Sequence, residues 1–221
     1  MKPSRLEQLS DGIFAIVMTI LVFELKVPDL FPGAGNYELW LGIKEILPSF
    51  FSYVLGFAML FTYWRAHHFF VSVYAKNING RLTNINALFF LLVGLVPFST
   101  SFLGKYSGNE LPIIIFGINT ILIGLCLLWM RNYVLHSEYL KNGEISRKDI
   151  NHGTIRTLIP VFSALLAIIL SFVSTKISLT LFTFAVLFNF SQRSTGLFNK
   201  FAKKLSLFFY GEKNKHLYDY D

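Results

Sequence analysis

The residues of this chain that are best suited to chemistry lie just before its first apolar segment. Arg5, Ser10 and Asp11 precede a largely apolar run from Ile13 to Leu25. Charged groups at the edge of hydrocarbon cost free energy, so a function is expected of them. Ser10 and Asp11 are also good helix N-caps, and capping is the simpler explanation for Ser10. Capping explains Arg5 poorly. Arg5 and Asp11 are six residues apart, so they are not neighbours on one helix face.

A second cluster of polar and aromatic residues lies at the end of the next apolar segment. Trp64 and His68 are one helical turn apart, whereas the adjacent His67 and His68 point about 100° apart on a helix. His67 and His68 therefore cannot easily bind one metal together. No further ligands are apparent, so we expect no metal site. An interfacial aromatic belt is the alternative interpretation. Asn84 and Asn86 open the third segment, where buried amides hydrogen-bond between helices.

The first segment also has a face suited to lining a pore. Ile16, Thr19, Ile20 and Phe23 share one side of a helix. Several copies around an axis would present apolar rings with one hydroxyl ring, which could dewet when closed and strip ions of part of their water when open. Such a narrow, weakly polar constriction favours potassium, which gives up water more easily than sodium. The alternative is that this face packs against neighbouring helices.

Composition indicates that these residues belong to a membrane protein. The chain has 221 residues, of which 53% are hydrophobic and only 15% charged, whereas soluble proteins carry about 25% charged residues. Lipid must therefore cover part of its apolar surface. A net charge of +7 would suggest nucleic acid in a soluble protein. Here the charges lie in loops and tail, where they set topology and meet anionic lipid, so we expect no nucleic-acid partner.

Continuous apolar runs predict an all-α, polytopic membrane fold with six transmembrane helices per subunit. The runs are Leu9–Leu25, Ile46–Val73, Leu82–Leu103, Leu111–Leu135, Leu158–Val173 and Ile177–Phe190. The fifth and sixth are short enough to form a hairpin turning at 174–176. Residues 1–193 are predicted to be the transmembrane domain and 194–221 a basic cytoplasmic tail. The tail's pattern suggests an amphipathic interfacial helix, with a solvated tail as the alternative.

The distribution of basic residues predicts the topology. With the N-terminus inside, fifteen of the 20 Lys and Arg residues fall on the cytoplasmic side and four on the other, with Arg65 inside the second segment. This positive-inside bias places both termini in the cytoplasm of a multi-pass cell-membrane protein. The 26–44 loop, rich in Pro and Gly, is expected outside, and 136–156 is expected to be the longest polar loop inside.

Catalytic signatures are not apparent in the sequence. It has no phosphate-binding glycine loop, no HExxH and no GxSxG pattern, so we expect no enzyme and no cofactor. The acidic residues Asp11, Glu24 and Glu110 lie near segment ends. A proton-driven pump usually buries its acidic residues deeper in the membrane, so these positions disfavour such a pump.

Three pieces of the chain together resemble one family. Arg5-Leu-Glu-Gln-Leu9-Ser10-Asp11, followed by GIFAIVMTILVFELKVP, is similar to the signature of the lysosomal potassium channel family known as transmembrane protein 175, in its bacterial form. Leu9 replaces the family's usual Phe. The stretches Trp64-Arg-Ala-His67-His68 and Asn86-Ala-Leu-Phe-Phe, with Val96-Pro97-Phe98, resemble softer landmarks. The specific resemblance covers roughly the first hundred residues.

The resemblance implies a potassium-permeable homotetramer of six-helix subunits that passes monovalent cations. The first helix would line the pore, with selectivity at Ile16 and further layers at Thr19 and Phe23, where the family more often has Leu. Arg5, Ser10 and Asp11 would tie the base of this helix to histidine and asparagine of the second and third helices.

Two other functions remain open from the sequence. A small proton-linked transporter or proton-leak pathway could use His67 or His68 as a relay, because histidine titrates near neutral pH. A structural or assembly protein without conduction is the third possibility.

Overall fold

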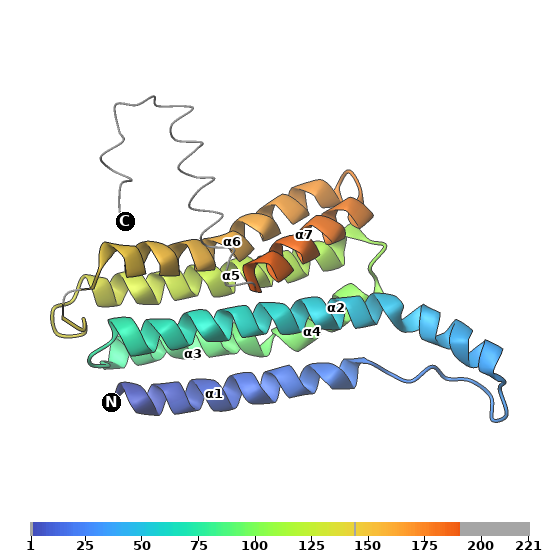
Figure 1. The fold of residues 1–221 in the computed structure, drawn as a ribbon, viewed down its shortest axis with the longest axis horizontal. Helices are drawn as coiled ribbons and strands as arrows, with labels where there is room; N and C mark the ends of the chain where they lie inside the picture. Colours follow the sequence, from blue (N-terminus) through green and yellow to red (C-terminus); the bar gives the residue numbers. More distant parts are fainter. Residues whose placement is uncertain (1, 144, 191–221) are drawn as a thin grey trace.

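The protein is described here by a computed structural model that covers residues 2–143 and 145–190. Long helices run side by side and form one bundle (Figure 1). In chain order they are α1 (Pro3–Ile20), the 3-10 turn η1 (Leu21–Glu24), α2 (Asn36–Phe69), the π-helical turn η2 (Phe70–Tyr74), α3 (Gly80–Gly94), α4 (Val96–Lys105), α5 (Glu110–Leu135), α6 (Arg147–Ser171) and α7 (Thr175–Phe190). The tail predicted at 194–221 lies outside the described residues.

The bundle confirms the prediction of an all-α membrane protein. Within the described residues, five helical segments are long and apolar enough to span a bilayer: 3–24, 36–74, 80–105, 110–135 and 149–171. The sixth predicted segment, α7, is apolar but has only 16 residues. It forms a hairpin with α6, in which the Ser178 hydroxyl donates to the Ala167 carbonyl at 2.6 Å.

Three helices begin well before the apolar runs predict. Helix α1 starts at Pro3 instead of Leu9, so Ser10 and Asp11 lie inside the helix and do not cap its start. Helix α2 starts at Asn36 instead of Ile46, inside the predicted outer loop, and its first turns project beyond the bundle (Figure 1). Helix α6 starts at Arg147 instead of Leu158, because the Ser146 hydroxyl caps it by accepting from the Asp149 N–H at 3.1 Å. Hydropathy marks only the continuous apolar part of a helix, so it does not predict first turns that are interrupted by charged residues.

The third predicted segment is two helices. Helix α3 ends at Gly94 and α4 begins at Val96, with Leu95 between them and Pro97 in the first turn of α4. A proline has no N–H, and its ring clashes with the carbonyl four residues earlier, so it breaks an interior helix but suits a first turn. The two helices still form one continuous apolar span.

Helix α2 lies at the centre of the bundle and α1 at its edge. Helix α2 contacts α1, α4, α5, α6 and α7, whereas the contacts of α1 are with α2, α3, α4 and the turns η1 and η2. Tyr63 of α2 is completely buried, and its hydroxyl donates to the Thr120 carbonyl of α5 at 2.7 Å. Because α1 is covered on one side only, its other side is left open.

Close packing of α5 against α6 depends on Gly124. A Cβ built at this position would overlap Val161 of α6 and lie 3.1 Å from the Tyr63 hydroxyl. We therefore expect Gly124→Ala to lower the free energy of unfolding by about 1–3 kcal/mol, the usual cost of overpacking. Gly94→Ala is the control, because nothing lies within 4 Å of a Cβ there. Thermal unfolding in detergent measures both, and equal stability of the two variants would contradict this packing.

Candidate functional site

Helix α1 has one buried and one open face along its length. Leu6, Phe14 and Val17 are buried against the bundle, together with Ser10 and the following Leu21. All four residues predicted to line a pore lie on the opposite side: Ile16, Thr19, Ile20 and Phe23. The exposed fraction is 60% for Ile16 and 76% for Phe23. The same helix therefore presents an open apolar face and an anchored face.

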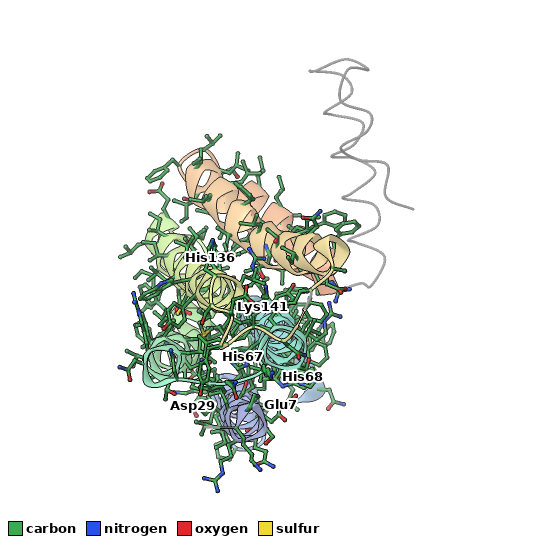
Figure 2. The ribbon with its side chains drawn as sticks, turned by 90° about the vertical axis from the view of Figure 1, so that its left-hand side faces the viewer. Glu7, Asp29, His67, His68, His136 and Lys141 are labelled. Atoms are coloured by element: carbon green, nitrogen blue, oxygen red, sulfur yellow. The ribbon has the colours of Figure 1, made fainter. Side chains whose placement is uncertain are left out.

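The anchored face is held by a buried hydrogen-bond chain across three helices. The Ser10 hydroxyl lies 3.1 Å from Nδ1 of His67 on α2, and Nε2 of His67 lies 2.8 Å from Oδ1 of Asn86 on α3. The ring of His67 stacks on Phe89 with centroids 5.0 Å apart. Seen from the end of the bundle, His67 lies among α1, α2 and α3 (Figure 2). This hydrogen-bond chain thus fixes α1 to α2 and α3.

The chain also defines the proton positions on His67. The Asn86 amide nitrogen donates to the Leu82 carbonyl at 2.9 Å, so the amide oxygen must face the imidazole. Nε2 of His67 therefore carries a hydrogen and donates, and Nδ1 accepts from Ser10. Both ring nitrogens of a neutral histidine are satisfied. The hydrogen-bond chain ends at the Leu82 carbonyl, which can only accept, so it offers no onward path for a proton.

Two exposed contacts lie beside this chain at the same end of α1. Nε1 of Trp64 donates to Asp11 Oδ1 at 2.8 Å. Nδ1 of His68 lies 2.9 Å from Glu7 Oε1, and the two residues are side by side in Figure 2. Trp64 and His68 stack with ring centroids 5.8 Å apart. Together these residues clamp the first turns of α1 to the end of α2.

Two residues expected in this network lie apart from it. Arg5 is exposed, and within the described part of one chain its guanidinium makes no ion pair, so the expected tie from Arg5 to other helices is not seen there. Asn84 is exposed instead of buried. Residues two apart on a helix point about 200° apart, so only one of Asn84 and Asn86 can face the bundle.

Two members of the site were missed in the sequence. Glu7 pairs with His68, and Phe89 provides the stacking surface for His67. Glu7 lies four residues before Asp11, on the same side of α1, so helical spacing could have indicated it. Phe89 lies three residues after Asn86 on α3, but many other Phe residues in this chain have similar spacing, so nothing distinguished it.

The contact between Trp64 and Asp11 gives a direct test of the clamp. Trp64→Phe keeps the ring but removes the N–H donor, and we expect a loss of about 1 kcal/mol in stability, since the bond is charge-assisted but exposed. Trp129→Phe on α5 is the control for the change of ring, because no hydrogen bond of the Trp129 indole occurs among the described residues. Trp129 is about half exposed, whereas Trp64 is partly buried. Thermal unfolding of both variants measures the difference. An equal loss in both would contradict a specific role for Trp64.

The fold is shared with a solved membrane channel. It matches the crystal structure of a lysosomal potassium-selective channel TMEM175 homologue from Chamaesiphon minutus with a TM-score of 0.74, over 87% of this chain and 97% of the other, at 24% identity. The helical bundle therefore places this chain in the class of multi-pass membrane proteins with that architecture. The sequence comparisons then identify the family.

Sequence similarity extends over most of the chain. The sequence model of the endosomal/lysosomal potassium channel TMEM175 matches residues 5–97. A potassium channel of Chryseobacterium sp. (strain P1-3) is 32% identical over 175 residues, which cover 78% of this chain and 84% of the relative. A potassium channel of Streptomyces collinus is 35% identical over 102 residues, which cover 46% and 48% of the two chains. The chain belongs to the TMEM175 family, which confirms the resemblance seen in its sequence.

Proposed function

We propose that this chain forms a potassium-permeable channel, in which four copies surround a central pore lined by the open face of α1. The observation that carries the proposal is the division of α1 into two faces. The four predicted pore residues are exposed, while the opposite face is buried and hydrogen-bonded. Membership of a potassium channel family supports the same function.

In this proposal, Ile16, Ile20 and Phe23 form apolar layers and Thr19 a polar one. The Thr19 hydroxyl hydrogen is directed to its own helix, with the Ala15 and Ile16 carbonyls at 2.9 and 2.8 Å. Its oxygen keeps lone pairs for a passing cation. A narrow apolar neck around Ile16 requires partial dehydration, which costs less for potassium than for sodium. The conduction is passive and needs no cofactor.

The hydrogen-bond chain would keep the pore face in register. Rotation of α1 would pull Ser10 away from His67 and leave buried polar groups unsatisfied, which costs about 1–3 kcal/mol for each group. The clamp made by Trp64 and His68 adds to this constraint. The distribution of Lys and Arg supports a cell-membrane channel whose N-terminus, and this end of α1, face the cytoplasm.

Flux measurements with the wild-type chain test this proposal. Purified protein in liposomes is expected to dissipate a potassium gradient faster than an equal sodium gradient, linearly with the driving force. Empty liposomes processed in parallel provide the background. Saturable uptake that requires a pH gradient would instead favour the transporter, and folded protein without flux would favour an assembly role.

A proton pathway is the second candidate, because one relative, from Bos taurus, is named an endosomal/lysosomal proton channel and is 30% identical over 115 residues, which cover 24% of it. In this protein both ring nitrogens of the buried His67 are hydrogen-bonded, and the hydrogen-bond chain ends at the Leu82 carbonyl. That arrangement makes the second candidate weaker. A pH-sensitive dye in the same liposomes separates the two, because passive potassium flux without acidification contradicts a proton pathway.

A further inference from the structure

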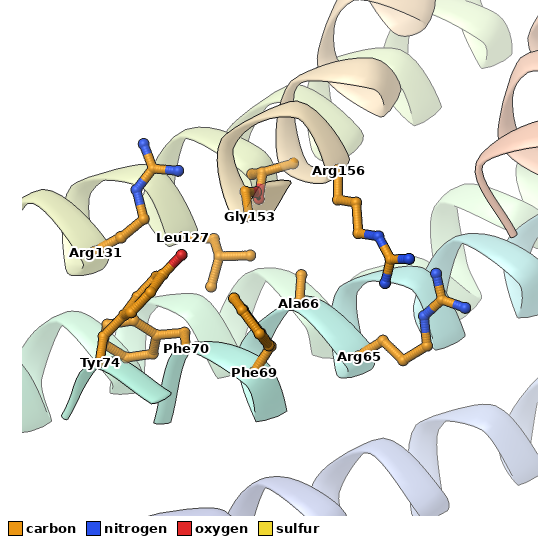
Figure 3. Close-up of a pocket in the computed structure, with 10 residues that line it drawn as sticks. Arg65, Ala66, Phe69, Phe70, Tyr74, Leu127, Arg131, Gly153 and Arg156 are labelled. Atoms are coloured by element: carbon orange, nitrogen blue, oxygen red, sulfur yellow. Dashed lines mark hydrogen bonds between the residues drawn. The ribbon is translucent and has the colours of Figure 1, made fainter. Parts of the chain in front are cut away.

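Cavities of two sizes lie between the helices of the bundle. The cavity drawn in Figure 3, where α2, α5 and α6 meet, has a free volume of about 30 Å³, which is room for about two water molecules. A larger cavity of about 240 Å³ lies towards the other end of the bundle, between η1, α2 and α4. The larger cavity can therefore hold a small organic group.

Tight contacts between α2 and α4 fix the walls of the larger cavity. A Cβ built at Gly104 of α4 would lie 2.8 Å from the Cα of Ser49, and a Cβ built at Gly56 of α2 would overlap the Thr100 side chain. Ser49 and Thr100 both line the cavity, as does Gly104 itself. Because the two helices are in such close contact here, the cavity is formed before any ligand binds.

The cavity lies at the depth where a bilayer has its headgroups. Glu24 is the last residue of the apolar span 3–24, Lys105 is the last residue of the span 80–105, and both line the cavity. Spans of 22 and 26 residues cross the hydrocarbon core, so their ends reach the polar headgroup region. Tyr53 lines the cavity on α2, and its ring centroid lies 6.2 Å from that of Phe57, one turn closer to the bilayer centre. The acyl chain of a lipid whose headgroup sits in the cavity would meet an apolar surface there.

Charged groups of both signs line the cavity. Glu24 is partly buried, and its carboxylate accepts a hydrogen bond from the Ser101 hydroxyl of α4. Lys26 and Lys105 are exposed and lie at the rim, with the Lys105 ammonium 5.6 Å from the centroid of the Tyr106 ring. Within the described part of the chain, none of these three charged groups makes an ion pair. All three charges therefore have capacity for a ligand.

This combination of charges favours a ligand with one positive and one negative end. Two lysines repel a simple cation, and Glu24 repels a simple anion. A primary ammonium group donates up to three hydrogen bonds, and Glu24 has lone pairs left beyond the one that Ser101 uses. The Thr100 hydroxyl is buried and has no hydrogen-bond partner among the described residues, so it offers a further acceptor. A phosphate suits the two lysine ammonium groups.

We propose that the cavity between η1, α2 and α4 binds a phosphoethanolamine group, supplied either by phosphatidylethanolamine of the bilayer or by soluble phosphoethanolamine. The ammonium end lies at Glu24, and the phosphate end lies towards Lys26 and Lys105 at the rim. Binding there would join the end of the first span to α4. The site does not depend on conduction, so a failure of the channel assignment leaves it standing.

Thermal shift of the full chain in dodecyl maltoside tests the site with defined probes. Dioctanoyl phosphatidylethanolamine and soluble phosphoethanolamine are the two probes. Dioctanoyl phosphatidylcholine is the matched control, because its trimethylammonium group has no N–H to donate. A ligand that binds the folded state raises the melting temperature. We expect phosphatidylethanolamine or phosphoethanolamine to raise it and phosphatidylcholine to have no effect.

The pattern of responses identifies the source of the group. A response to phosphatidylethanolamine alone indicates a lipid, and a response to phosphoethanolamine indicates a soluble ligand. No response to either probe, or an equal response to phosphatidylcholine, would overturn the proposal.

Variants connect the response to the cavity. Glu24→Gln keeps an oxygen that can accept from Ser101 but removes the charge, and we expect it to raise the probe concentration for half-maximal shift by about tenfold. Lys26→Gln should also weaken binding, and it provides a second test if the first variant does not fold. Glu110→Gln is the matched control, because Glu110 is exposed in the first turn of α5 and does not line the cavity. Equal weakening in Glu110→Gln, or wild-type binding in both cavity variants, would contradict the site.

Discussion

Replacement of Ile16 by asparagine is expected to abolish most of the preference for potassium over sodium. Ile16 is exposed on the open face of α1, one turn before Ile20. An amide ring in place of an apolar ring would keep water in the neck and let sodium pass without dehydration. A fall of about tenfold in the permeability ratio corresponds to about 1.4 kcal/mol of lost discrimination between the ions. Reversal potentials or paired liposome fluxes measure it.

Ile13 provides the matched control for this experiment. It lies on the same helix three residues earlier, but it is partly buried and packed against the core. Ile13→Asn places the same amide against neighbouring helices, so we expect lower stability with an unchanged permeability ratio. Equal changes of the ratio in both variants would contradict the assignment of the pore face.

The second large effect is expected at His67, whose replacement by alanine should strongly destabilise the protein. The change removes two hydrogen bonds and leaves the Ser10 hydroxyl and the Asn86 amide oxygen buried without partners. It also opens a cavity beside Phe89. The two unsatisfied groups, at about 1–3 kcal/mol each, and the cavity together should cost about 3–5 kcal/mol, and α1 should lose its fixed orientation. Thermal unfolding and size-exclusion chromatography measure the loss of stability and of assembly.

The neighbouring His68 makes a stringent comparison. It is exposed, and its contacts are the ion pair with Glu7 and the stacking on Trp64. Because exposed ion pairs contribute about 0–1 kcal/mol, His68→Ala should cost far less than His67→Ala. Similar losses in the two variants would show that the buried chain does not hold α1.

Much of this architecture could be predicted from the sequence because hydropathy follows directly from what lipid must cover. The all-α class followed from continuous apolar runs. The early starts of α2 and α6 could not be predicted in this way, since charged residues interrupt the first turns of both helices. The start of α6 also depends on local capping by Ser146. The break at Leu95 had a visible cause in Pro97, although the apolar run through it concealed the boundary.

The part of the candidate site that lies on a single helix could be predicted from the sequence. The open face of α1 follows from helical spacing alone, so Ile16, Thr19, Ile20 and Phe23 could be grouped without a structure. Contacts between helices were harder, because spacing does not show which side chains meet. The resemblance indicated histidine and asparagine as partners, but not that His67, rather than His68, would bond Ser10. Arg5 and Asn84 show the same limit, because spacing did not reveal that both residues are exposed and lie apart from the network.

Water accessibility of Ile16 tests the central claim most directly, because an open face can line a pore or contact lipid. Ile16→Cys in a Cys126→Ser background should react with a charged, water-soluble thiol reagent and lose flux. Phe162→Cys on α6, a residue with a similar exposed fraction of 61%, should stay unmodified in lipid. Modification and block at Ile16 alone is the result that our account predicts. An unreactive Ile16→Cys in liposomes that conduct potassium would contradict it.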